Sequence, residues 1–138
     1  IAVYSQHAKN ALGDKETLNV WLRRSSPNKH LAILMSIQLN RNWNGQLRFI
    51  TAVANEEDVK RAKAAQERLF DRARLPISSE AVVLVGNFKE VLPKAPVADL
   101  NIFGISNELD GDTMHTLAEA VNTSCLFVKD SGGESMVV

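Results

Sequence analysis

Apolar and polar residues are arranged along the chain in blocks that predict strands and helices in alternation. A β-rich run at 17–24 is followed by a helix-compatible run at 26–41 and by a second β-rich run at 47–53. Ser26 is a favourable N-cap, and Pro27 suits the first helical position, where a missing N–H costs nothing. Two β-rich runs separated by a helix are most simply joined in parallel by a right-handed crossover. The stretch therefore predicts a first βαβ unit.

The same alternation continues to the end of the chain. Helical spacing recurs in two further runs, one beginning after Asn55 as a cap and the other after Asp112. Further strands are predicted at 81–85, 99–105 and 124–129. The run at 81–85 is apolar throughout, which is typical of a parallel strand buried on both faces.

The order of these elements predicts a three-layer α/β domain. We expect a mainly parallel, five-stranded sheet with helices on both faces, spanning residues 17–138 as a single domain. Residues 1–16 are treated as a linker or the end of a preceding segment, although the first four residues also fit a short strand. The 138 residues have the size of one domain, and the start at Ile1 without a methionine predicts a fragment of a longer protein.

The first helix is unusual because apolar residues surround most of its circumference between positions 31 and 39. Such a helix is usually buried on more than one side. One side can cover the sheet, and the other side needs a neighbour. The candidate interface residues are Leu31, Leu34, Met35 and Gln38. A short apolar run of this length also fits a strand, so the pattern leaves that alternative open.

Composition excludes disordered and collagen-like chains, since 45% of the residues are apolar and 23% are charged. No apolar run reaches the roughly 18 residues of a membrane span. The net charge is zero, but residues 1–75 hold 13 Lys/Arg against 7 Asp/Glu, and residues 76–138 hold 3 against 9. This asymmetry fits a basic face for lipid headgroups or an acidic partner, but charges on solvated helix faces that interleave in space are the favoured explanation.

The second helix has a basic outer face that raises the question of nucleic-acid or lipid binding. The basic residues are Lys60, Arg61, Lys63, Arg68, Arg72 and Arg74. No aromatic residue is interleaved for base stacking, and Glu67 and Asp71 interrupt the basic run. These features favour a solvated surface helix and no nucleic-acid partner.

In sheets of this kind, ligands bind beyond the carboxyl ends of the strands, where the strand order reverses. None of the expected loops has the glycine-rich sequence that lets backbone N–H groups approach a phosphate. The loop after the fourth strand instead carries Glu108, Asp110 and Asp112, which would repel an anion, and no glycine lies between Gly111 and Gly132. The sequence therefore predicts no nucleotide site and no other cofactor.

No pattern of reactive residues predicts a metal site or catalysis. Glu108, Asp110, Asp112 and His115 match no metal-ligand spacing, and acidic residues before a helix are ordinary caps and dipole partners. The three histidines are scattered, and no serine lies in a G-x-S-x-G elbow. The single cysteine, Cys125, lies in an apolar run and is predicted to be a buried, inert thiol.

Several short stretches carry a resemblance to a known family. They are Asn19-Val-Trp-Leu22, Leu31-Ala-Ile-Leu-Met35 with Asn42-Trp43, Leu47-Arg-Phe-Ile50, Ala98-Asp-Leu-Asn-Ile-Phe-Gly-Ile105, Cys125-Leu-Phe-Val128 and Gly133-Glu-Ser-Met-Val137. Over residues 17–138 the chain resembles the C-terminal cytoplasmic domain of the cation-chloride cotransporters, including the sodium-potassium-chloride branch. The fold that this resemblance implies is like that of the universal stress proteins.

The chain departs from the eukaryotic pattern of this family at three places. Lys129-Asp130 stands where an arginine-glycine is expected, and 107–112 replaces a basic, proline-containing loop. The long regulatory insertion expected after Gly86-Asn87 is missing. These differences indicate a compact prokaryotic member and argue against regulation by phosphorylation of the eukaryotic type.

The resemblance implies a non-catalytic regulatory and dimerisation domain of a membrane cation-chloride symporter. Such a domain would lie on the cytoplasmic side of the cell membrane as part of an integral membrane protein. Its partners would be a second copy, the transmembrane portion and the preceding half-domain of the same polypeptide. The alternative hypotheses are a free-standing nucleotide-binding protein of the universal stress type and a small flavodoxin-like enzyme.

Overall fold

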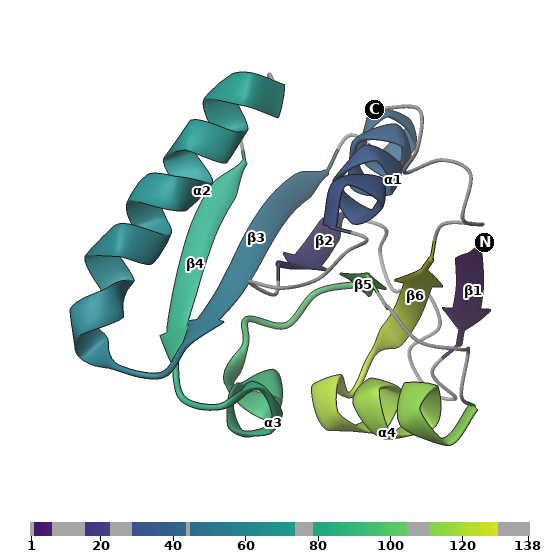
Figure 1. Cartoon of the computed structure of the whole chain (residues 1–138). Coiled ribbons are helices and arrows are strands. Elements are labelled where there is room, and N and C mark those ends of the chain that lie inside the picture. Colours follow the sequence, from purple (N-terminus) through teal and green to yellow (C-terminus); the bar gives the residue numbers. More distant parts are fainter. Residues whose placement is uncertain are drawn as a thin grey trace.

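A mixed sheet with helices on both sides forms the centre of the chain (Figure 1). The computed structural model describes residues 2–6, 16–22, 29–43, 45–73, 79–104 and 111–129. In these residues the strands are β1 (Ala2–Ser5), β2 (Thr17–Trp21), β3 (Gln46–Val53), β4 (Glu80–Val85), β5 (Leu100–Gly104) and β6 (Ser124–Val128). Their order in the sheet is β1-β6-β5-β2-β3-β4. The strands from β2 to β6 are parallel, and β1 is antiparallel to β6.

The strand order reverses at β2, which pairs with β3 on one side and with β5 on the other. Chain order runs outward from β2 to β4 and then returns to β5 and β6. This arrangement is the doubly wound one, in which the carboxyl ends of the two central strands mark the usual ligand crevice.

Helices of the described residues cover both faces of the sheet (Figure 1). On one face lie α1 (Lys29–Trp43) and α2 (Val59–Ala73), and on the other lie α3 (Phe88–Val91) and α4 (Gly111–Val121). Two short 3-10 turns, η1 (Glu56–Asp58) and η2 (Leu92–Lys94), precede α2 and follow α3. The predicted three-layer α/β class is confirmed.

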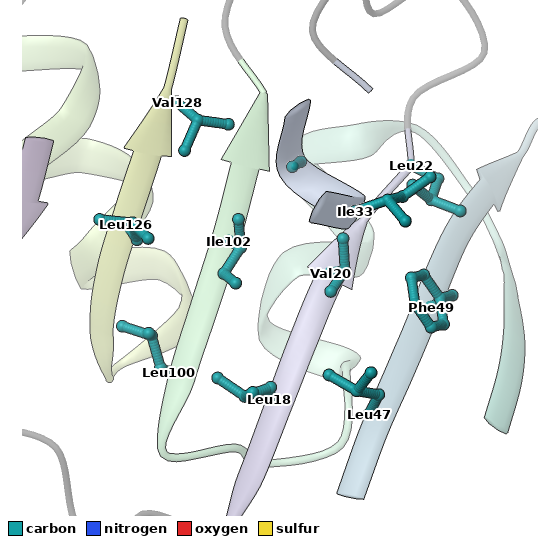
Figure 2. Packing of buried hydrophobic residues seen from close by; sticks show 11 residues of the cluster. Leu18, Val20, Leu22, Ile33, Leu47, Phe49, Leu100, Ile102, Leu126 and Val128 are labelled. Carbon is teal, nitrogen blue, oxygen red and sulfur yellow. The ribbon is translucent and has the colours of Figure 1, made fainter. Parts of the chain in front are cut away.

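The first core lies between the sheet and α1 and α2. Successive strand residues point to opposite faces, so alternate residues of each strand reach this core. Figure 2 shows the buried side chains that form it: Leu18, Val20, Leu22, Ile33, Leu47, Phe49, Leu100, Ile102, Leu126 and Val128. From the helix side, Met35 and Leu69 pack against this cluster.

The second core, on the α3 and α4 side, is built around a row of aromatic rings. Trp21 stacks on Phe103 with ring centroids 5.7 Å apart, and Phe103 stacks on Phe127 at 5.6 Å. Phe88 from α3 meets Trp21 edge-on at 5.7 Å. Such pairs add about 0.5–1.5 kcal/mol each beyond the area that they bury. The row therefore joins β2, β5 and β6 across one face of the sheet.

The sheet has six strands in the described residues, and our expectation of five is wrong because β1 is a strand of this fold. Ala2 pairs with Val128 and Ser5 with Cys125, so β1 covers the outer edge of β6. The first residues of the chain are therefore not a linker, while 7–15 lie outside the described residues. The sequence pattern of the first residues fits a short strand, but it does not show that this strand pairs with one near the other end of the chain.

Three smaller expectations also differ from the structure. The apolar run 81–85 belongs to an edge strand that is half-buried, because β4 is last in the sheet order. Asn55 makes no side-chain capping bond, and the chain enters α2 through a 3-10 turn. Asp112 lies in the first turn of α4 rather than before it. The predicted cap of the first helix, Ser26, lies outside the described residues.

A carboxylate clamp fastens β2 to the segment before β5. Asp99 Oδ2 accepts hydrogen bonds from the backbone N–H groups of Glu16 at 2.8 Å and Thr17 at 3.0 Å, and from the Thr17 hydroxyl at 3.3 Å. The Asp99 N–H donates in return to the carbonyl oxygen of Thr17 at 3.1 Å. Close by, a Cβ on Gly45 would collide with the carbonyl oxygen of Glu16, so this approach requires glycine.

We expect Asp99→Ala to lower the free energy of unfolding by about 1–3 kcal/mol, because it leaves part-buried donors of β2 without their charged acceptor. Urea denaturation followed by circular dichroism measures this loss. The control is Asp71→Ala on α2, where the side chain is exposed and no bond to it is described. A loss for Asp99→Ala no larger than that of the control would contradict the clamp.

Candidate functional site

The usual ligand crevice of this fold lies beyond the carboxyl ends of β2 and β5. These strands end at Trp21 and Gly104, and the loops that follow, 23–28 and 105–110, lie outside the described residues. Glu108 and Asp110 are in the second of these loops. The absence of a nucleotide site therefore stays a prediction from the sequence.

A buried polar network lies nearer the amino ends of the strands, on the α3 and α4 side. The Trp21 Nε1–H donates to Asn101 Oδ1 at 2.8 Å, and the Asn101 amide donates to the Thr123 hydroxyl at 2.6 Å. The Asn19 amide donates to the carbonyl oxygen of Pro96 at 2.7 Å, while Asn19 Oδ1 is buried without a partner. These bonds join β2 to β5, β5 to the residue before β6, and β2 to the connection before β5.

Arg48 holds the same connection from β3. Its guanidinium donates to the carbonyl oxygen of Val97 at 2.9 Å and lies 3.8 Å from the carboxylate of Glu80. The Val97 carbonyl oxygen accepts this bond, but the residue exposes 82% of its surface. Sequence reasoning missed this polar set, and the available signal was the presence of Asn19 and Asn101 inside otherwise apolar strands. The hydrogen bonds of this polar set hold strands and a connection in place, and none of them indicates a catalytic role.

The residues weighed as metal ligands are not brought together in the described part of the chain. Asp112 and His115 are exposed on α4, and no described group of three His, Cys, Asp or Glu side chains could hold a metal ion. His30 is exposed at the start of α1, and His7 lies outside the described residues. The prediction that no metal is bound stays a prediction.

Cys125 is fully buried in the second core, as predicted from its apolar neighbours. Burial raises the pKa of its thiol to about 12, because the apolar surroundings disfavour the thiolate. The Sγ atom lies 3.6 Å from the carbonyl oxygen of Thr123. A thiol in this position is not a nucleophile at neutral pH.

The side of α1 that faces away from the sheet contains the four candidate interface residues. They differ in solvent exposure and form two pairs. Leu34 exposes 60% of its surface and Gln38 is also exposed. Leu31 and Met35 are half-buried and pack against the first core. No residue from 31 to 40 is charged. None of the described helices has the length and apolar character needed to cross a membrane.

The fold defines the class of this chain, a doubly wound α/β domain like the universal stress proteins. A universal stress protein from Archaeoglobus fulgidus DSM 4304 superposes with a TM-score of 0.63 at 15% identity, covering 94% of this chain and 50% of that one. A universal stress protein in complex with cAMP gives 0.61 at 21% identity, covering 83% and 96%. At these identities the likeness shows the fold alone.

The chain belongs to the family described as the second C-terminal domain of prokaryotic cation-chloride cotransporters, whose model matches residues 13–137. The crystal structure of the cytoplasmic domain of a prokaryotic cation chloride cotransporter superposes with a TM-score of 0.82 at 27% identity. It covers 99% of this chain and 55% of that one, so the chain spans just over half of that structure. No curated protein matches the chain. The family is associated with transport rather than with catalysis.

The burial of Cys125 predicts a thiol that iodoacetamide does not alkylate in the native protein at pH 8, because almost no thiolate is present and the sulfur is covered. Mass spectrometry before and after denaturation measures this: no added group in the native state, and one after unfolding. The raised pKa also makes the free energy of unfolding depend on pH. The contribution of this thiol is fully present below pH 9.0, its ordinary pKa, and is lost as the pH rises towards about 12, because the unfolded chain ionises first. Rapid native alkylation would contradict the assignment.

Proposed function

We propose that this chain is a non-catalytic cytoplasmic domain of a membrane cation-chloride symporter, and that it regulates the symporter by holding two copies together. Membership of the cotransporter family supports the parent protein. The relative solved as a cytoplasmic domain supports its place on the inner side of the membrane. The surface of α1 supports a role in contacting protein.

The observation that carries the dimer is the apolar outer surface of α1. Burying a leucine side chain stabilises an association by about 1.5–3 kcal/mol, and Leu34 remains largely exposed in the single chain. The surface has no charge from 31 to 40, while His30 and Arg41 lie at its ends. An uncharged centre with a polar rim is the usual composition of a protein interface.

A two-fold axis through this surface would let the same residues serve both copies. In such an isologous contact, Leu34 of each copy packs against the opposite α1, and the flanking Gln38 side chains supply hydrogen bonds at the edge. Leu31 and Met35 already pack inward and would extend the apolar contact. The preceding half-domain or the transmembrane portion of the same polypeptide are the competing neighbours for this surface.

We expect Leu34→Lys to convert the protein from a dimer to a monomer, because it places a charge at the centre of the contact. The side chain is mostly solvent-exposed, so the free energy of unfolding should change by less than about 0.5 kcal/mol. Size-exclusion chromatography with multi-angle light scattering measures the mass. A second variant, Met35→Glu, should act in the same direction.

The matched control is Val97→Lys, the same kind of change at a side chain that is still more exposed and lies on the α3 and α4 side. It should leave the dimer intact. A wild-type protein that is monomeric at all concentrations would overturn the dimer, and equal dissociation by both lysine variants would overturn the assignment to α1.

The alternative function, nucleotide binding, rests on the fold shared with a universal stress protein in complex with cAMP. We expect no change in Tm on adding ATP or cAMP, because the sequence has acidic residues where a phosphate cradle needs glycines. A ligand at 100 times its Kd would stabilise the native state by about 2.7 kcal/mol, an increase of several degrees. A concentration-dependent rise of that size would favour the alternative.

A further inference from the structure

The rotation of α2 about its own axis is fixed by a buried glutamine. Gln66 is only 4% exposed, and its amide donates to the carbonyl oxygen of Phe49 at 2.9 Å and to the Thr51 hydroxyl at 2.8 Å. Phe70, one turn further on, packs against Phe49 with ring centroids 5.1 Å apart. These contacts turn one side of α2 to the sheet and leave the opposite side facing away from it.

Three arginines form a single row on the outward side of α2. With 3.6 residues per turn, Arg61, Arg68 and Arg72 fall within about 40° of one another around the helix. All three are exposed, and the neighbouring positions Ala64 and Ala65 are small, while Asp71 lies about one turn after Arg68. We call these three residues the arginine row.

The arginine row has no carboxylate partner among the described residues. The salt bridge in this part of the chain joins Arg48 to Glu80 on β3 and β4, and no described hydrogen bond involves the row. Helical spacing places Glu67 closer to Lys60 and Lys63 than to the row. Asp71 and Glu57 lie within about one turn of Arg68 and Arg61, but no ion pair between them is described. Arg68 and Arg72 are like charges four residues apart, which destabilises a helix unless an anion lies between them.

The helix beside α2 adds no negative charge to this face. The sequence of α1 contains no acidic residue and contributes Arg41, whereas the layer on the other face of the sheet carries Glu90, Asp112 and Glu119 together with Lys89 and Lys94. Figure 1 shows α1 and α2 on the same side of the sheet. The row therefore belongs to the more basic of the two helix layers.

The length of the row defines the kind of anion that fits it. At a rise of 1.5 Å per residue, Arg61 and Arg72 are about 16 Å apart along the axis, too far for one phosphate group to bridge. The ligand must repeat its anionic groups over that distance, as a membrane surface or a nucleic acid does. No aromatic side chain accompanies the row for base stacking, since Phe70 faces the core.

We infer that the arginine row docks α2 on the anionic phospholipid headgroups of the membrane that holds the parent transporter. The inference rests on the proposed function for the presence of that membrane, and adds the surface by which the domain lies against it. Each arginine near an anionic surface strengthens association about fivefold at physiological ionic strength. The attraction falls off within a Debye length, so it weakens at high salt.

The test is sedimentation of the full chain with vesicles of phosphatidylglycerol and phosphatidylcholine, compared with vesicles of phosphatidylcholine alone. We expect binding to the anionic vesicles that salt reverses. Arg68→Glu/Arg72→Glu should weaken it at least 25-fold, about fivefold per arginine. The matched control, Lys60→Glu/Lys63→Glu, makes the same change in net charge on the other side of the exposed surface and should weaken binding much less.

Three outcomes would overturn the inference: equal loss in the two double variants, equal binding to neutral vesicles, or tighter binding to a single-stranded oligonucleotide than to anionic vesicles at the same salt. Thermal unfolding and light scattering of both variants serve as the internal check, since their Tm and mass should match those of the wild type. If the protein does not bind vesicles but keeps the mass of a dimer, the docking inference is overturned and the proposed dimerisation is not. The experiment therefore distinguishes the two proposals.

Discussion

Burial of both faces of β2, β5 and β6 constrains every other part of the chain. These strands place leucine, isoleucine and valine side chains towards α1 and α2, and aromatic rings towards α3 and α4. A sheet that is apolar on both sides is stable in water only when helices cover both sides. Burying a polar group costs free energy unless it is paired, and Asn101 accordingly bonds both Trp21 and Thr123. Asn19 Oδ1 is an exception, because it is buried without a partner among the described residues.

The same constraint produces two different outer surfaces on one layer. On α2, Gln66 and the apolar residues face inward and the charged residues face outward, so the helix is sharply divided. On α1, Ile33 and Ala32 fill the contact with the sheet, yet the sequence continues to be apolar on the far side. A helix with more apolar surface than its own sheet can cover has a second surface to bury. The layer thus combines an uncharged surface suited to protein with a basic one suited to anions.

The order of elements could be predicted because helical and strand periods are local properties of the sequence. The predictions that were wrong concern features that depend on the position of a strand in the sheet. The run 81–85 has the composition of a buried strand, but composition does not record that β4 is last in the order. β1 was not assigned because its partner, β6, lies more than a hundred residues away. Asp99 showed no local signal either, since the donors that it accepts from belong to a distant strand.

The sequence indicated which helix carries the candidate interface surface, but not which of its residues are exposed. The uncharged stretch pointed to α1, whereas the rotation that exposes Leu34 and half-buries Met35 is known only from the structure. The buried side of this helix consists of Ala32, Ile33, Ser36 and Asn40. The arginine row required the same information for α2, which Gln66 supplies through bonds to β3. A doubly wound fold shared with universal stress proteins at low identity determines the layers and not what their outer surfaces bind. In a cotransporter domain, divergence of function is therefore expected on the exposed sides of α1 and α2, where substitutions cost the core nothing.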